Sequence, residues 1–279
     1  MTLAPLAHSS APFTLSILIW LPLALALVVN ALPAKQVGKA AAVASLLTVA
    51  VAVTFVVNFD AHAPGLQFVT DKVWIGALGI HYKLAMNGLN VALVLLTTVL
   101  FTISLAWSAM REVERPHTYY FWFGLAESAV LGAFLAQDLM LFVAFFDLML
   151  IPFYFLVGSW GTGDRVRATI KMVIYTMVGS FLMLAAAVAT GVIASGDHGT
   201  GLNFTFSALQ HLPLSRTDED WIFLAFALAF LVKMPIAPFH GWLADAYKSM
   251  PIPAVAVFSG VVAKVASYGF LQIVLPLFP

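Results

Sequence analysis

The chain has no cysteine and few charged residues. The missing cysteine excludes disulfides, thiolate-held iron–sulfur clusters and cysteine nucleophiles within these 279 residues, so the chain shows no means of redox chemistry of its own. Its seven histidines have no HxxxH or comparable ligand spacing, which argues against a metal site. A net charge of zero gives no reason to expect nucleic acid as a partner.

Hydrophobic residues dominate instead. They make up 62% of the chain against 9% charged residues, and the mean hydropathy is +0.98. No water-soluble domain could cover its surface with so few polar side chains. The composition therefore predicts a polytopic membrane protein.

Apolar runs long enough to cross a bilayer of about 30 Å recur along the chain. We expect an all-α fold with about eight transmembrane helices, at residues 13–32, 39–59, 87–110, 119–136, 139–158, 169–194, 221–243 and 253–275. The first run has no basic segment before it and is too long for the apolar region of a cleaved signal peptide. It is therefore read as a membrane helix.

Lysine and arginine are unevenly shared between the connections. One alternate set holds eight of them: Lys35, Lys39, Arg111, Arg115, Arg165, Arg167, Lys171 and Lys248. The other set holds three: Lys72, Lys83 and Arg216. By the positive-inside rule, this bias predicts an N-terminus outside the membrane.

Two connections on the expected outer side are long. In the first, apolar and polar residues alternate from Ile80 to Met86 after the turn-prone Gly79, which predicts a short strand and a small external hairpin. The second, residues 195–220, is rich in Gly, Asp, Ser and Thr and is read as a solvated loop.

Four ionisable residues lie near the middle of expected spans: Glu127, Asp147, Lys233 and Lys264. A charge at this depth costs on the order of 3 kcal/mol unless it is paired, so such residues commonly mark a proton or ion path. Two acids and two bases balance in charge, which suits residues that face a shared protein interior and not the lipid. Asp147 and Lys233 are the expected pair, either as a functional contact or as a fixed ion pair between helices.

The seventh expected span is interrupted close to its lysine. Pro235 and Pro238 lack the amide protons that would bond the carbonyls of Leu231 and Met234, so we expect a broken helix with free carbonyls beside Lys233. Interrupted helices at mid-membrane are a feature of ion-handling proteins. An ordinary proline kink relieved by packing is the alternative.

The remaining candidates allow more than one interpretation. Lys264 has small neighbours that leave room for water, so it is either a proton carrier or a lysine that snorkels to the interface. Glu127 is either a proton site or a hydrogen-bonded helix contact. His240 could relay protons, since histidine titrates near neutral pH, while Asp245 could cap or orient a loop.

Most tryptophans, including Trp242, lie near span ends and are read as interfacial anchors.

Several strings resemble one family. KMPIAPFHGWLADAY, SGVVAKVASYGFLQIVLPLFP, LAQDLMLFVAFFDLMLIPFYFLVGSWG and MNGLNVALVLLTT are similar to the antiporter-like subunits, of the M type, in proton-pumping NADH:quinone oxidoreductase, bacterial respiratory complex I. The likeness covers most of the chain and is strongest from about Lys83 onward. It implies that Lys233 is the central lysine of a broken seventh helix, Lys264 the next proton carrier and Asp147 the acidic partner of Lys233.

The resemblance also implies an assignment for the rest of the chain. Residues 1–116 would hold three helices and the hairpin, and residues 117–279 the first five-helix repeat of an inverted-repeat fold, with His240 on the family's histidine. The chain would translocate protons in the cytoplasmic membrane beside L-like and N-like subunits. It would hold no cofactor, while NADH, flavin, iron–sulfur clusters and quinone would be bound elsewhere in the complex.

The chain departs from the family pattern in places. Asp147 replaces a glutamate, Ala244 and Tyr247 replace a proline and a histidine, and Asn87 stands where an aspartate is common. The second repeat is absent, which fits a fragment, a split gene or a degraded copy. Rival interpretations are the D-type subunit of a multisubunit cation/proton antiporter, the membrane arm of a formate- or hydrogen-oxidising complex, and a non-conducting remnant.

Overall fold

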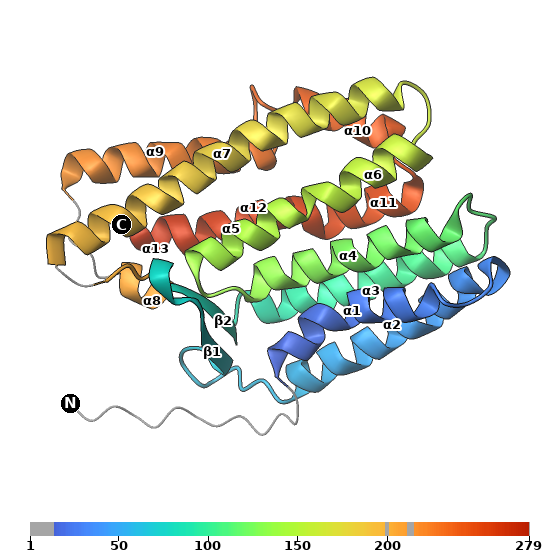
Figure 1. Cartoon of the computed structure of the whole chain (residues 1–279), viewed down its shortest axis with the longest axis horizontal. Coiled ribbons are helices and arrows are strands. Elements are labelled where there is room, and N and C mark those ends of the chain that lie inside the picture. The colour runs from blue at the N-terminus through green and yellow to red at the C-terminus, as the bar shows by residue number, and fades with distance from the viewer. Residues whose placement is uncertain (1–13, 199–200, 211–214, 279) are drawn as a thin grey trace.

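Long helices lie side by side over most of the molecule, and a short hairpin lies at one end (Figure 1). The computed structural model describes residues 14–198, 201–210 and 215–278. The expected start of the first span, residue 13, and residues 199–200 and 211–214 of the expected outer loop lie outside the described residues.

The first helices build a group around α4. The bounds in this part of the chain are α1 Leu15–Val29, α2 Ala34–Val57, α3 Asn90–Ala109 and α4 Pro116–Leu135. α1 packs against α4 and α2 against α3, while α4 also contacts α5, α6 and α12. Nearly every α4 residue from Phe123 to Leu135 is buried, so this helix forms the centre of the bundle.

The second half of the chain adds shorter and interrupted helices. They are α5 Leu139–Leu148, α6 Leu150–Trp160, α7 Arg165–His198, α8 Phe206–Leu209, α9 Arg216–Lys233, α10 Gly241–Ser249, α11 Ile252–Val257, α12 Ala263–Gly269 and α13 Leu275–Leu277. Two π-helical stretches, Phe258–Val262 and Phe270–Val274, join α11, α12 and α13 into one rod. α9 packs against α7, and so does α10.

Five helical segments of the described residues are long and apolar enough to cross a membrane: Ala34–Val57, Asn90–Ala109, Leu139–Trp160, Arg165–Ile193 and Ile252–Leu277. α1 is also apolar but has 15 residues. α9 starts with Arg216, Asp218 and Glu219 and ends with Lys233, so charges reduce its apolar character. The protein is therefore a mainly helical membrane protein, as its composition predicts.

An antiparallel hairpin joins α2 to α3. Its strands are β1 Gln67–Ile75 and β2 Ile80–Met86, and β2 is the strand expected after Gly79. A short 3-10 turn, Gly76–Leu78, precedes Gly79, whose φ of 62° is a conformation that favours glycine. A Cβ at Gly79 would overlap the carbonyl of Leu202, so the turn lies directly against the α7–α8 connection.

Asp138 ties this end of the molecule together. Its Oδ1 accepts from the amides of Met140 and Leu141 at 3.0 and 3.1 Å, which caps the start of α5. Its Oδ2 accepts from the amide of His81 on β2 at 3.0 Å. The hairpin is thereby attached to the helix that carries Asp147.

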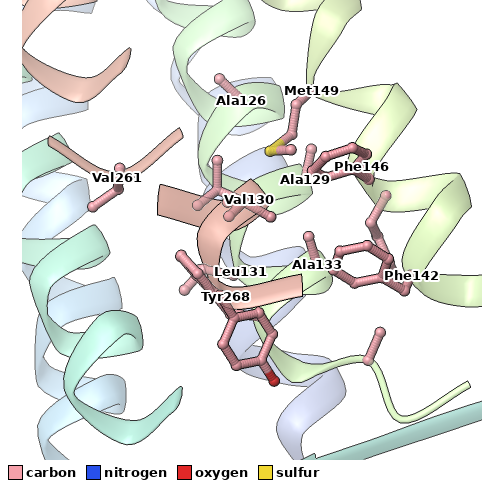
Figure 2. Packing of buried hydrophobic residues seen from close by; sticks show 14 of the residues in the cluster. Ala126, Ala129, Val130, Leu131, Ala133, Phe142, Phe146, Met149, Val261 and Tyr268 are labelled. Carbon is pink, nitrogen blue, oxygen red and sulfur yellow. The ribbon is translucent and has the colours of Figure 1, made fainter. Parts of the chain in front are cut away.

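The helix centres pack through small residues against aromatic rings. Ala129 and Ala133 of α4 lie against Phe146 and Phe142 of α5, with Tyr268 of α12 beside them (Figure 2). The Phe134 and Tyr268 rings meet edge to face at a centroid distance of 5.3 Å. Small residues on α4 let the neighbouring backbones approach closely, as is common between membrane helices.

Candidate functional site

Asp147 and Lys233 are in direct contact. Asp147 is near the end of α5 and Lys233 is the last residue of α9, and the distance from Nζ to Oδ1 is 3.1 Å. The Lys233 side chain is 10% exposed and that of Asp147 35%. The structure thus places the two residues as the expected pair.

Three further contacts surround this pair. The Lys233 Nζ donates to the carbonyl of Phe146 at 3.2 Å and lies 3.5 Å from the centre of the Phe146 ring. Ser180 of α7 donates its hydroxyl to the same Asp147 oxygen at 2.5 Å. A buried ammonium group loses its hydration, and the carboxylate, carbonyl and ring replace part of it. Sequence reasoning missed Ser180, whose only signal is a hydroxyl within an apolar span.

The helix that carries Lys233 is interrupted next to it. The α9 helix ends at Lys233, before Pro235 and Pro238, and helix resumes at Gly241. On the other side of the pair, α5 ends at Leu148 and α6 begins at Leu150, but Met149 between them keeps a helical backbone, with φ −57° and ψ −29°. The segment Leu139–Trp160 is therefore one span, in agreement with the span expected at residues 139–158, with a local irregularity near Pro152, which lacks an amide donor for the Leu148 carbonyl.

Two carbonyls at the end of α9 find hydrogen-bond partners. The Leu231 carbonyl, expected to be unpaired, accepts from the Ile236 amide at 3.1 Å. The Val232 carbonyl accepts from the Trp242 indole at 3.1 Å. Trp242 is 1% exposed, so its interpretation as an interfacial anchor is wrong: its ring is buried because it bonds the interrupted backbone.

A cavity of about 40 Å³ lies beside Lys233. Residues of α5, α6, α7, α9, α10, α12 and the π-helical stretch Phe258–Val262 line it, among them Thr176, Trp242 and Ala266. A volume of this size accommodates a water molecule, and the Lys233 ammonium and the Thr176 side chain supply polar groups. The ion pair is therefore adjacent to a space that water can enter.

Lys264 lies outside this group. Its side chain is exposed, and its Nζ donates to the carbonyls of Ser259 at 3.2 Å and Gly260 at 2.6 Å in the preceding π-helical stretch. It does not line the Lys233 cavity, although its neighbour Ala263 does. The expected shared interior of four charged residues is therefore not formed within the described chain.

Glu127 also lies apart from the pair. It is 1% exposed on α4 and lines a separate cavity with residues of α1, α2 and α3. Its Oε1 is buried and has no hydrogen-bond partner among the described residues. The structure does not bring it near Lys233.

His240 and Asp245 flank the start of α10. His240 is exposed, at the residue before Gly241, and does not meet the pair. Asp245 forms an ion pair with Lys171 of α7 at 2.7 Å. This contact attaches α10 to α7, in agreement with an orienting role. Within the described ranges, no group of three or more His, Asp or Glu residues could hold a metal ion.

Comparison with known proteins decides the family. The model of the family described as NADH:quinone oxidoreductase/Mrp antiporter, transmembrane, matches residues 136–279, just over half of the chain. The chain belongs to this family. The matched segment contains Asp147, Lys233 and Lys264, whereas Glu127 precedes it.

Full-length relatives of this family extend the likeness. The chain is 38% identical over 280 residues to NADH-quinone oxidoreductase subunit M of Rhodobacter capsulatus, which covers 95% of this chain and 54% of that protein. A chain of respiratory complex I from Thermus thermophilus with bound NADH matches at 25% identity with a TM-score of 0.83, covering 95% and 54%. The chain spans about half the length of the curated relatives it matches.

The fold is also present in an antiporter complex. A chain of the Mrp complex from a Dietzia species matches with a TM-score of 0.77 at 19% identity, covering 92% of this chain and 28% of that one. At this identity the match shows the shared fold alone.

Proposed function

We propose that this chain is part of a proton-translocating membrane subunit of NADH:quinone oxidoreductase. The observation that carries the proposal is the Asp147–Lys233 contact at 3.1 Å between α5 and the end of the interrupted helix α9, next to a cavity. The relative from Rhodobacter capsulatus bears the name of a subunit of that enzyme. In this proposal, electron transfer and the NADH, flavin, iron–sulfur and quinone sites belong to other subunits.

The ion pair acts as an electrostatic switch. At an effective dielectric constant of about 20, two unit charges about 4 Å apart attract by about 4 kcal/mol. That energy corresponds to roughly three orders of magnitude in the affinity of a lysine for its proton. While the carboxylate is close, Lys233 keeps its proton. When a neighbouring subunit draws the pair apart, Lys233 gives the proton up to water in the adjacent cavity.

The other intramembrane groups have less direct roles. Lys264 receives protons further along, on a face that another part of the assembly would have to cover. His240, exposed near the end of α9, lies where protons could exchange with the solvent. Ser180 positions the Asp147 carboxylate, because it holds the same oxygen that faces Lys233.

The proposed topology has eight membrane crossings. They are α1, α2, α3, α4, α5 with α6, α7, α9 with α10, and α11 through α13. Residues 1–116 make up the N-terminal helices and hairpin, and residues 117–279 the first antiporter-like repeat. The connections rich in lysine and arginine face the cytoplasm, which leaves the N-terminus and the hairpin outside the cytoplasmic membrane. Its partners in the membrane are L-like and N-like subunits.

A cation/proton antiporter subunit is the second candidate function. The family description names Mrp antiporters as well, and the Mrp chain shares the fold. Both functions would use a buried Asp–Lys pair. They differ in what drives the protons, which is electron transfer in one and a cation gradient in the other.

Replacement of Lys233 tests the proposed function. We expect Lys233→Ala, in the full-length protein within its complex, to lower proton pumping by at least about tenfold, since tenfold is worth about 1.4 kcal/mol and the pair is worth more. Pumping is measured in reconstituted vesicles during NADH oxidation, and assembly is checked on native gels. Lys248→Ala, at an exposed lysine of α10, is the matched control. Normal coupling in Lys233→Ala would remove this residue from the path. Protons driven by a sodium gradient alone would favour the antiporter.

A further inference from the structure

The Glu127 carboxyl lies in an apolar part of the helix bundle, and no described residue that lines its cavity is basic. The cavity that it lines has a volume of about 20 Å³. Its walls come from α1, α2, α3 and α4, and Tyr120 and Glu127 are the only residues in them that titrate. An ionised carboxylate in such surroundings, with no cation beside it, is strongly disfavoured relative to the neutral acid.

Two buried oxygen atoms beside this cavity lack a partner. The Oε1 of Glu127 and the Oγ1 of Thr48 are both buried with no hydrogen-bond partner among the described residues. Ser45, one turn before Thr48 on α2, also lines the cavity, and its hydroxyl donates to the Ala42 carbonyl at 2.8 Å. Buried polar atoms are rarely left unpaired, and a cavity of this size holds one water molecule with these groups as partners.

Tyr120 separates this cavity from the end of the molecule. It lines the Glu127 cavity and also an open pocket of about 510 Å³, whose charged lining residues are Lys35, Lys39, Arg111 and Glu112. The Tyr120 side chain is 3% exposed, so it is the wall between the two spaces. Gly124, one turn further along α4, allows α1 to pack closely: a Cβ there would lie 2.9 Å from the Pro22 carbonyl.

We propose that Glu127, Ser45 and Thr48 form a proton- and water-binding site, in which a protonated Glu127 exchanges its proton with the solvent past the Tyr120 hydroxyl. The site lies outside the segment that the family model matches and does not contact the Asp147–Lys233 pair. Its ligands are one water molecule and one proton. It stands whether or not the chain pumps protons.

Infrared spectroscopy of the full chain in lipid nanodiscs tests the site. At neutral pH, the wild type should show the C=O stretching band of a protonated carboxylic acid, and Glu127→Gln should lose it. The band should shift in D₂O, because the proton exchanges. Thr48→Val, which keeps the side-chain shape, should move the band without removing it. Glu114→Gln, at an exposed glutamate that lines neither space, is the control and should leave the band unchanged.

Exchange kinetics test the role of Tyr120. Tyr120→Phe keeps the ring but removes the hydroxyl, and we expect about fivefold slower deuterium exchange of the Glu127 band, the ratio that corresponds to ~1 kcal/mol for one hydrogen bond. Equal exchange rates in both proteins would overturn the proposed route. A wild type without the acid band, or a band abolished by added sodium, would overturn the protonated site and indicate an ionised or cation-binding carboxylate.

Discussion

At the scale of single residues, the Asp147 carboxylate meets two donors at one oxygen. Lys233 and Ser180 both bond Oδ1, at 3.1 and 2.5 Å. The resemblance places a glutamate here, one methylene longer. The shorter side chain still reaches Lys233, at 3.1 Å, and the lysine also donates to the backbone carbonyl of Phe146, the residue before Asp147.

Asp147 should therefore tolerate a change of length and not a loss of charge. We expect Asp147→Asn in the full-length protein to lower quinone-linked proton pumping by about tenfold or more, since a neutral amide forfeits most of the ~4 kcal/mol attraction to Lys233. Asp147→Glu should stay within about threefold of wild type, less than the tenfold that ~1.4 kcal/mol represents. Pumping and NADH oxidation are measured together. If Asn equals wild type in both, the pair is structural and the switch is wrong.

The sequence identifies this pair but not its surroundings. Four ionisable residues at mid-span indicate that charges pair within the membrane, and the family resemblance selects Asp147 as the partner of Lys233. Ser180 could not be predicted, because a serine in a membrane span suits any close helix contact. Glu127 was recognised as intramembrane, yet only the structure shows that it faces α1, α2 and α3.

At the scale of elements, interruptions determine which groups meet. Pro235 and Pro238 indicate a break after Lys233, but the partners of the released carbonyls, Ile236 and Trp242, depend on the path of the chain between α9 and α10. In the π-helical stretches before and after α12, residues on one face of the helix are spaced differently from those of a regular α-helix. A period of 3.6 residues therefore cannot show that Lys264 lies on an exposed face.

The hairpin gives a test of how the outer elements fit together. Gly79→Ala should lower the melting temperature, because the new Cβ overlaps the Leu202 carbonyl and the residue has a φ of 62°. The cost should be at least ~1 kcal/mol. Thermal unfolding in detergent provides the measurement.

Two other glycines are matched controls for this substitution. Gly65 has a φ of 100° but open space around its Cα, so Gly65→Ala reports backbone strain alone. Gly88 has open space as well and no positive φ, so Gly88→Ala should change little. If Gly79→Ala unfolds at the same temperature as Gly65→Ala, the overlap with the Leu202 carbonyl adds no destabilisation beyond the backbone strain.

At the scale of the whole molecule, the connections rich in lysine and arginine lie together at one end. The hairpin and α8 lie at one end, and the connections α1–α2, α3–α4, α6–α7 and α10–α11 lie at the other (Figure 1). The second end holds Lys35, Arg111, Arg165 and Lys248. Composition and charge placement thus predict the membrane class and the grouping of connections. They do not predict that α4 is the buried centre, which depends on packing on all its sides.

The last prediction concerns the 279 residues by themselves. In liposomes they should conduct no protons, because the groups that would carry them do not form a continuous set. The cavity beside Lys233 holds about 40 Å³, and Lys264 is exposed, held by carbonyls of its own helical rod. Glu127 lines a separate cavity with residues of α1, α2 and α3.

An imposed pH gradient measures this directly. Vesicles with the chain should lose the gradient no faster than empty vesicles, while a protonophore added at the end should collapse it in both. The decisive comparison is between wild type and Lys264→Ala, with Lys248→Ala as the control at an exposed lysine. A proton leak that depends on Lys264 would show that these helices alone complete a path, in which case Lys264 would have to reach Lys233 through a conformation other than the one described. No leak in any variant would agree with a path that needs the additional helices of the longer relatives.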